Sequence, residues 1–579
     1  MATRFILVAL AALAAVAGSV TPAHAQWIPN GVPVCTAADD QSSSRAASDN
    51  AGGAIIVWAD SRSGNQDIYA QRLNASGVRQ WAANGVPVCT AANGQTSPDV
   101  VADGAGGAYV VWMDSRSPSQ PNIYLQRITS TGAVATGWRL NGICVCTSAV
   151  YPYKAVIVAD GSGGAVVAWE DYRSGYADIY AQRIILADTT RRWPVAGLAV
   201  CSATGDQTSP VCVGDGSGGM LFAWQDARAS AMVSDVYVQH LTAEGVIVPG
   251  WPLDGTVASP TSGLRTAINP TLVADGASGL IVAWEDYRNV NAGIYALRLT
   301  AGNTIPAGWV AGGIAVCDTV NDQKEPLAVP DGSGGTVVVW KDDRINPGVS
   351  DLYAKRMTGA GAAAPGWPPS GAAVCTAAGE QAAPRIVPDG AGGAVVTWYD
   401  YRAGTNTDIY AQRLTWTGDV APGWATNGLA LCSATRDQQG PTAVPDGSGG
   451  AIVAWQDYRS GTNYDIYATR VTGAGGGMLD VSGPPLAAFR IHEPRPNPCS
   501  GMAAFAFELP AERAVEACVF DLAGRLMRTL EPGRSFPAGT HQLAWDGRDD
   551  GGSPVAAGVY LVRMKAGSEV QVRRMVRLR

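Results

Sequence analysis

Short runs of apolar residues, separated by turns rich in Gly, Asp and Asn, make up most of the chain. In one representative stretch the runs cover residues 428–432, 442–445, 450–455 and 465–471. Runs of about four to eight residues between such turns are typical of β-strands, and a succession of them indicates an antiparallel meander. The runs are apolar on both faces, which predicts sheets covered on both sides.

This stretch is repeated eight times, and each copy carries a Trp-x-Asp-x-Arg pentapeptide. An Asp in an Asp-Gly-x-Gly-Gly-like turn stands nine residues before the tryptophan of every copy. The copies are 54 to 60 residues apart, a period that indicates one supersecondary unit repeated. The eight tryptophans are Trp58, Trp112, Trp169, Trp224, Trp284, Trp340, Trp398 and Trp455.

A second series of eight tryptophans begins at Trp27 and ends at Trp424, each followed eight residues later by Cys, or in one copy by Ser259. The series is offset from the pentapeptides, so the last copy lacks this strand and residues 27–35 can supply it. Pairing of the two chain ends removes the exposed edges of an open array. We therefore predict an all-β fold, an eight-bladed β-propeller with four-stranded blades whose N-terminal strand closes the last blade. A seven-bladed ring with a spare repeat and an open solenoid are the alternatives.

The bulk composition agrees with an all-β protein with many turns and core tryptophans, because 47% of the 579 residues are hydrophobic and 70 are Gly. The formal net charge is −8 and there is no long basic run, so nucleic acid is not expected as a partner. Seven of the eleven cysteines share one repeat position and are interpreted as buried small residues rather than disulfides. The pairs Cys144/Cys146 and Cys499/Cys518 are the ones whose oxidation is worth testing.

The first 25 residues have the pattern of a secretory signal peptide. Arg4 gives a positive start, residues 5–18 an apolar segment, and Ala23 to Ala25 a small-residue cleavage site. We predict export, a mature start at Gln26 and no later transmembrane segment.

Polar side chains recur at three positions of the repeat and are expected on one rim of the ring. The Asp and Arg of the pentapeptide share a strand face, and a Gln follows the outer-strand Cys by six residues in six copies. Hydrogen bonding within the blades explains such groups without a ligand; a lectin-like ring of equivalent sugar sites is the functional alternative. The candidate ligand-binding rim comprises Gln41, Asp60, Arg62, Gln95, Asp114, Arg116, Asp171, Arg173, Gln207, Asp226, Arg228, Asp286, Arg288, Gln323, Asp342, Arg344, Gln381, Asp400, Arg402, Gln438, Asp457 and Arg459.

Little in the sequence indicates a cofactor or catalysis. The Asp-Gly turn offers one carboxylate, whereas calcium takes about six to eight oxygen ligands, so we expect no cofactor and keep calcium as an alternative. The four histidines form no catalytic triad or zinc motif. Glu170 and Glu285 are the candidates for a glycosidase, but they occupy the variable position of the pentapeptide and are interpreted as surface variation. A single active site should break the repeat symmetry, which is weakest at Tyr151–Lys154 and at residues 259–269.

The C-terminal part has a different composition. A Gly/Pro-rich segment at 475–498 is interpreted as a linker, and four apolar runs follow it as strands of a small sandwich. The motifs at 496–498, 520–530, 538–541, 545–549 and 558–560 resemble the immunoglobulin-like domain named after the flagellar hook-capping protein.

The same motifs are similar to the type A C-terminal sorting domain of the type IX secretion system. That resemblance implies export across an outer membrane and contact with the secretion machinery, while the hook-capping protein's assembly segment has no counterpart here.

The predicted organisation is a signal peptide at 1–25, a propeller at 26–474, a linker at 475–498 and an Ig-like sorting or attachment domain at 499–579. We predict a non-catalytic binding protein for a glycan or protein ligand, secreted or held on the outer-membrane surface of a Gram-negative-type bacterium. An exported carbohydrate-active enzyme and a purely structural envelope protein are the alternatives.

Overall fold

A computed structural model describes residues 27–578 except 118–120, 147–150, 162, 186–189, 260–264, 476–488, 492–493, 495–496, 500–501, 510–512 and 537–538. The chain divides into two compact units, Met1–Met478 and Leu479–Arg579, which are described separately. The predicted signal peptide and most of the predicted linker lie outside the described residues. No helix in the described part of the chain is long and apolar enough to cross a membrane.

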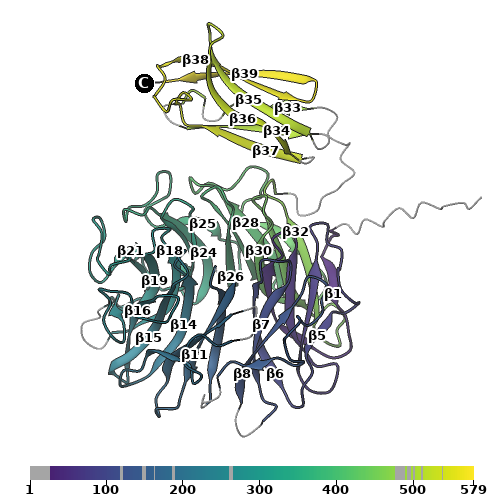
Figure 1. Cartoon of the computed structure of the whole chain (residues 1–579), viewed down its shortest axis with the longest axis vertical. Coiled ribbons are helices and arrows are strands. Elements are labelled where there is room, and N and C mark those ends of the chain that lie inside the picture. Colours follow the sequence, from purple (N-terminus) through teal and green to yellow (C-terminus); the bar gives the residue numbers. More distant parts are fainter. Residues whose placement is uncertain are drawn as a thin grey trace, which may run out of the picture. The chain divides into compact units, whose positions relative to one another are not determined.

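The first unit consists of eight four-stranded antiparallel sheets that follow one another in chain order, and no helix occurs among its described residues (Figure 1). We number the sheets as blades 1 to 8 from the N-terminus. The innermost strands are β2 (Gln41–Ser48), β6 (Gln95–Ala102), β10 (Tyr153–Ala159), β14 (Gln207–Gly214), β18 (Ala267–Ala274), β22 (Gln323–Pro330), β26 (Gln381–Pro388) and β30 (Gln438–Pro445).

The second strand of each blade ends in the Trp-x-Asp part of the pentapeptide or just beyond it. These strands are β3 (Ala54–Asp60), β7 (Ala108–Asp114), β11 (Gly164–Asp171), β15 (Met220–Ser230), β19 (Leu280–Asp286), β23 (Thr336–Asn346), β27 (Ala394–Asp400) and β31 (Ala451–Asp457). The third strands are β4 (Asp67–Leu73), β8 (Asn122–Ile128), β12 (Asp178–Ile185), β16 (Val233–Leu241), β20 (Gly293–Leu299), β24 (Val349–Met357), β28 (Asp408–Leu414) and β32 (Asp465–Val471).

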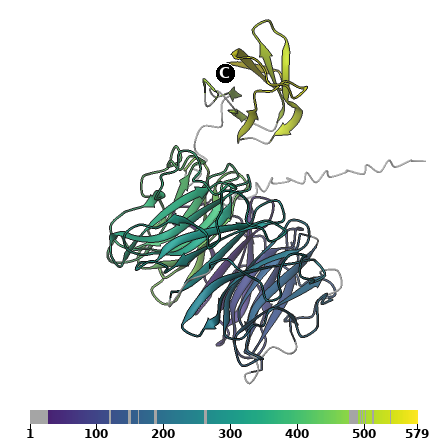
Figure 2. The ribbon, with the colours of Figure 1, turned by 90° about the vertical axis from the view of Figure 1, so that its left-hand side faces the viewer.

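The outer strands are short and complete each blade. They are β5 (Val86–Cys89), β9 (Ile143–Cys144), β13 (Leu198–Cys201), β17 (Thr256–Val257), β21 (Ile314–Cys317), β25 (Ala372–Cys375), β29 (Leu429–Cys432) and, for blade 8, β1 (Val32–Cys35). Figure 2 shows the ribbon turned by 90° about the vertical axis.

The N-terminal strand closes the ring, which confirms the eight-bladed propeller. β1 pairs antiparallel with β32, with Val32 opposite Ala468, and the two strands lie side by side in Figure 1. The backbone N–H of Gln41 at the start of blade 1 donates to the carbonyl of Tyr464 in blade 8 at 2.8 Å. The first and last blades are therefore joined by both strand pairing and a direct hydrogen bond.

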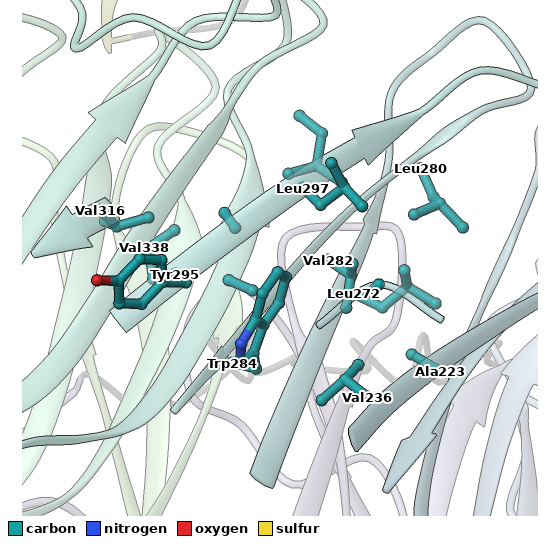
Figure 3. Close-up of a cluster of buried hydrophobic side chains, with 14 of the residues drawn as sticks. Ala223, Val236, Leu272, Leu280, Val282, Trp284, Tyr295, Leu297, Val316 and Val338 are labelled. Atoms are coloured by element: carbon teal, nitrogen blue, oxygen red, sulfur yellow. The ribbon is translucent and has the colours of Figure 1, made fainter. Parts of the chain in front are cut away.

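Both tryptophan series lie in the core between blades, as predicted. The eight pentapeptide tryptophans are completely buried, and the outer series is between 3% and 8% exposed. Figure 3 shows Trp284 and Tyr295 of blade 5 packed with Val236 of blade 4 and Val338 of blade 6. Each sheet is thus covered on both faces by its neighbours, which explains why its strands are apolar on both faces.

The second unit is a two-sheet β-sandwich. One sheet has the order β33 (Arg490–Ile491), β34 (Ala503–Leu509), β37 (Gly539–Trp545), and the other β36 (Leu526–Phe536), β35 (Arg513–Asp521), β38 (Gly558–Ala566), β39 (Glu569–Arg577). Phe505, Val519, Trp545 and Val562 are at most 1% exposed in its core. The small sandwich expected from the four apolar runs is present, and it has the Ig-like architecture that the resemblance implied.

Candidate functional site

The Trp, Asp and Arg of the pentapeptide form a buried network of hydrogen bonds at one end of each blade, which we call the polar knot. In blade 1 the Asp60 carboxylate accepts hydrogen bonds from Trp58 Nε1 at 2.7 Å and from the backbone N–H of Arg62 at 3.0 Å. Arg62 Nε also donates to it at 2.7 Å. Because the carboxylate is completely buried, these charge-assisted bonds replace the water it has lost.

The guanidinium of Arg62 contacts the third strand of its own blade, the turn before the outer strand of that blade, and the outer strand β1 of blade 8. It stacks on the Tyr69 ring, 4.0 Å from the centroid, and donates to the carbonyl oxygen of Asn84 at 2.9 Å. Its Nη2 also lies 3.1 Å from Cys35 Sγ. Burial raises the pKa of the Cys35 thiol to about 12, so Cys35 is an unreactive packing group beside an arginine.

The same ion pair occurs in every blade, with N–O distances of 2.5–2.7 Å, aspartates without exposed surface and arginines 16–30% exposed. The pairs are Asp60–Arg62, Asp114–Arg116, Asp171–Arg173, Asp226–Arg228, Asp286–Arg288, Asp342–Arg344, Asp400–Arg402 and Asp457–Arg459.

The repeated glutamine fixes the loop that leads into each blade. Gln41 is completely buried, and its Nε2 donates to the carbonyl of Asp39 at 2.7 Å. The same bond to the loop carbonyl two residues earlier is made by Gln95, Gln207, Gln323, Gln381 and Gln438. Within the predicted rim, the glutamines and aspartates are therefore held by protein partners, and only the arginines reach solvent. Ligand binding by the rim stays a prediction.

The Asp-Gly turn is likewise held by the protein itself. Asp49 Oδ1 accepts from the N–H groups of Ala51 at 2.8 Å and Gly53 at 2.7 Å, and Oδ2 pairs with Arg72 at 3.0 Å. In blade 4, His240 replaces this arginine and lies 2.9 Å from Asp215. No group of three or more His, Cys, Asp or Glu residues suited to a metal ion occurs in the described ranges.

Glu170 and Glu285 do not lie on the surface, so their interpretation as surface variation was wrong. Both are only 2% exposed. Each accepts a hydrogen bond from a backbone N–H on the inner strand of the next blade, Glu170 from Ser209 at 2.7 Å and Glu285 from Glu325 at 3.0 Å. In these two copies the variable position faces the inner strand of the next blade, which covers the side chain once the blades pack.

Every inner strand carries a β-bulge near its middle. In β2, Ser42 pairs with Ala59 and Arg45 with Val57, so two residues of β2 stand opposite one of β3. The first bulge residue has a φ between 46° and 58° in all eight blades, a left-handed conformation that re-aims the side chains around it. These residues are Ser43, Ser97, Lys154, Ser209, Asn269, Glu325, Ala383 and Gly440.

The bulges surround a cavity of about 560 Å³ in the centre of the propeller. Seven of the eight inner strands line it, chiefly with the first bulge residue and the two that follow. This volume lies within the roughly 300–1,000 Å³ typical of small-molecule sites. Whereas the buried knots are nearly identical, the cavity residues differ from blade to blade.

Charged cavity residues come from five blades. They are Arg45 of blade 1, Asp99 of blade 2, Lys154 of blade 3, Glu325 of blade 6 and Arg385 of blade 7. Burial raises the pKa of Asp99, although the nearby charge of Arg45 opposes that shift.

Sequence reasoning missed this cavity as a site, although two of its signals were visible. Tyr153 and Lys154, in the first symmetry departure, line the cavity, and so does Asn269 at the end of the second. Residues 260–264 of the second departure lie outside the described residues. The clearest signal was variation two and four residues after the repeated Gln, at positions such as Ser43 and Arg45.

Comparison with known proteins supports the two-part architecture. Residues 499–569 match the family of the FlgD Ig-like domain, so the chain combines an eight-bladed propeller with a domain of this type. No curated protein matched the sequence.

Among solved structures, the polysaccharide lyase Uly1 is 9% identical, with 69% of this chain and 93% of that chain covered and a TM-score of 0.38. The α-L-arabinofuranosidase Arb93A of Fusarium graminearum is 14% identical, with 55% and 93% covered and a TM-score of 0.33. PorZ of Porphyromonas gingivalis, a surface component of the type IX secretion system, is 13% identical, with 91% and 74% covered and a TM-score of 0.26. No function is carried over from similarities of this size.

Proposed function

We propose that this protein is an exported, non-catalytic binding protein that holds a glycan or protein ligand at the central cavity of its propeller. The observation that carries the proposal is the loss of repeat symmetry at the cavity. The knots repeat in all eight blades, whereas the first bulge residue is Ser, Lys, Asn, Glu, Ala or Gly. A packing role favours the same residue in every blade, and a single ligand favours different ones.

Binding explains the cavity better than catalysis does. The oxygens of Glu170 and Glu285 accept hydrogen bonds from the next blade. The runner-up is a carbohydrate-active enzyme that uses Asp99 and Glu325, the carboxyls that line the cavity. Asp99 accepts from the N–H groups of Val100 at 3.0 Å and Ile157 at 3.2 Å, which favours a fixed structural acceptor over a mobile acid.

A glycan-array screen of the chain from residue 26 to 579, with and without calcium, tests the proposal. Val211 lines the cavity, so Val211→Trp should block it, whereas Val246→Trp, on an exposed loop, should not. Selective binding that is lost in Val211→Trp but kept in Val246→Trp supports the central cavity as the binding site. Absence of binding to any glycan and to any extracellular protein contradicts the proposed function. Binding that occurs only with calcium would contradict the proposed site, which is proposed without a metal ion.

A test of hydrolase activity separates the proposed binding function from the alternative of a carbohydrate-active enzyme. The glycans that bind are incubated with the protein, and the release of new reducing ends is measured. Hydrolysis that disappears in Asp99→Asn or Glu325→Gln would establish the enzyme instead. Binding without turnover supports the non-catalytic proposal.

The C-terminal domain is proposed to deliver the protein to the secretion machinery. Support comes from its match to an Ig-like domain family and from the resemblance of its motifs to those of type A sorting domains. Deletion of residues 495–579 should leave the propeller inside the outer membrane, as measured by surface protease accessibility in a host with this secretion system. Unchanged surface location of the shortened chain contradicts a sorting role.

A further inference from the structure

Arg45 and Arg385 occupy equivalent positions in two blades that flank blade 8. Each stands two residues after its first bulge residue, on β2 and β26 respectively, and both line the cavity. Blade 8 lies between them, because β30 packs against β2 on one side and β26 on the other. At the corresponding positions blade 8 carries Gly440 and Thr442, which are small and uncharged, so blade 8 places no further charge between the two arginines at these positions.

Neither guanidinium has a carboxylate partner. No carboxylate oxygen of the described residues lies within 4.0 Å of either one, in contrast to the knots, where every arginine is paired. Arg45 Nη1 donates to the carbonyl of Ser44 at 3.1 Å, and Arg385 Nη1 donates to the carbonyl of Pro384 at 2.9 Å. A guanidinium has five N–H donors, so most of the donors of both residues remain available.

The two arginines also influence each other. Desolvation lowers the pKa of Arg385, and the positive charge of Arg45 lowers it further, while the negative charge of Glu325 opposes the shift without reversing it. An anion held between the two groups would offset both effects, because it pairs with each guanidinium and replaces lost water.

The other cavity charges already have partners. Lys154 Nζ donates to Ser209 Oγ at 2.8 Å and lies 3.7 Å from Glu170. Glu325 lies 3.5 Å from Lys341, and Asp99 accepts from two backbone N–H groups. Arg45 and Arg385 are thus the charged groups of the cavity that a ligand can satisfy.

The remaining lining suits a polyhydroxylated ligand. Ser43 and Ser97 add hydroxyl groups to the cavity lining, and Asn269 adds an amide whose Nδ2 donates to Glu285 at 2.9 Å. The Tyr153 ring, 56% exposed, is an apolar surface for a sugar ring. Arginine binds planar carboxylates through two parallel hydrogen bonds. This combination of groups favours a sugar acid over a neutral sugar.

We propose that the central cavity binds an acidic saccharide, with a carboxylate of the uronic-acid type between Arg45 and Arg385. This inference rests on the proposed function and names its ligand class. Sulfated saccharides and inorganic anions share the charge, and the experiment separates them from a sugar carboxylate.

The test is calorimetric titration of the chain from residue 26 to 579 with a trigalacturonate, its neutral galactose counterpart, a sulfated galactose oligosaccharide and inorganic sulfate. Trigalacturonate should bind and the neutral trisaccharide should bind at least about tenfold more weakly, a difference of about 1.4 kcal/mol. Arg45→Gln and Arg385→Gln should each reduce the affinity about tenfold or more. Arg79→Gln, on an exposed loop between β4 and β5, is the matched control and should change nothing.

Melting temperatures show whether the variants fold. Removal of one of two unpaired like charges should leave the melting temperature of the free protein unchanged or higher, so lost affinity is not lost structure. Tighter binding of inorganic sulfate or of the sulfated sugar than of trigalacturonate overturns the carboxylate assignment. Binding of a neutral glycan or a protein that both Arg→Gln variants retain and Val211→Trp loses overturns this inference but keeps the proposed function. If no ligand of any kind binds, the proposed function fails as well.

Discussion

Removal of the closing strand tests how much the closed ring contributes to stability. Val34 is completely buried, and Trp27 and Val32 are 4% and 8% exposed. At roughly 1.5–3 kcal/mol for each buried apolar side chain, these three contribute about 5–9 kcal/mol. Because ordinary domains are stable by only about 5–15 kcal/mol, the loss should be large.

Polar contacts at the closure add to this effect. Arg459 Nη2 donates to the carbonyl of Asn30 at 2.6 Å, and the N–H of Ser433 donates to Asn30 Oδ1 at 2.9 Å. A chain that begins at residue 36 loses both contacts and leaves β32 with an unpaired edge. We therefore expect a strongly lowered urea midpoint, followed by tryptophan fluorescence, and a tendency to associate through the free edge.

Single substitutions make the test quantitative. Val34→Ala should lower the free energy of unfolding by about 2 kcal/mol, since two buried methyl groups are lost at about 0.8 kcal/mol each and a cavity remains. Val246→Ala, on an exposed loop, should change it by less than about 0.5 kcal/mol. A peptide of residues 26–35 should restore part of the stability of the shortened chain. If the shortened chain and Val34→Ala both unfold at the wild-type urea concentration, closure by β1 does not stabilise the ring.

Three further predictions concern the repeated unit. Asp60→Asn should cost about 3 kcal/mol in urea unfolding, because it leaves the partly buried Arg62 guanidinium without its carboxylate. The control Glu244→Gln, at an exposed residue, should cost less than about 0.5 kcal/mol, and equal midpoints would contradict a structural ion pair. Burial raises the pKa of Asp465 from its ordinary value of about 4 to about 6, so its ionisation lowers stability increasingly between about pH 4 and pH 6 and by its full amount above pH 6. Asp465→Asn should therefore raise the melting temperature at pH 7.5 more than at pH 5, and an equal shift at both pH values would refute the burial effect. Gly85→Ala should destabilise the protein by more than about 1 kcal/mol in thermal unfolding. Gly85 has a φ of +87°, and a Cβ added there would lie 2.5 Å from the Trp58 ring. A wild-type melting temperature would show that the turn adapts to the added methyl group.

The architecture was predictable because it depends on local pattern and on counting. The spacing of Trp58 and its equivalents set the number of repeats, and the offset of the series that begins at Trp27 predicted which strand closes the ring. Alternation along a strand also placed Asp60 and Arg62 together, although not the stacking of Arg62 on Tyr69 or its contact with Cys35.

The position of the cavity residues was decided by tertiary structure. In the sequence, Arg45 and Arg385 stand at the same variable position of two different repeats, but no local pattern shows that this position faces a common cavity. Ring closure places blades 1 and 7 on either side of blade 8, and the bulge in each inner strand sets which side chains enter the centre. The burial of Glu170 likewise depends on the neighbouring blade that covers it. The sequence alone determined the repeat, its strands and its closure, because these follow from short-range periodicity, whereas the composition of the cavity required the distances that only the closed ring defines.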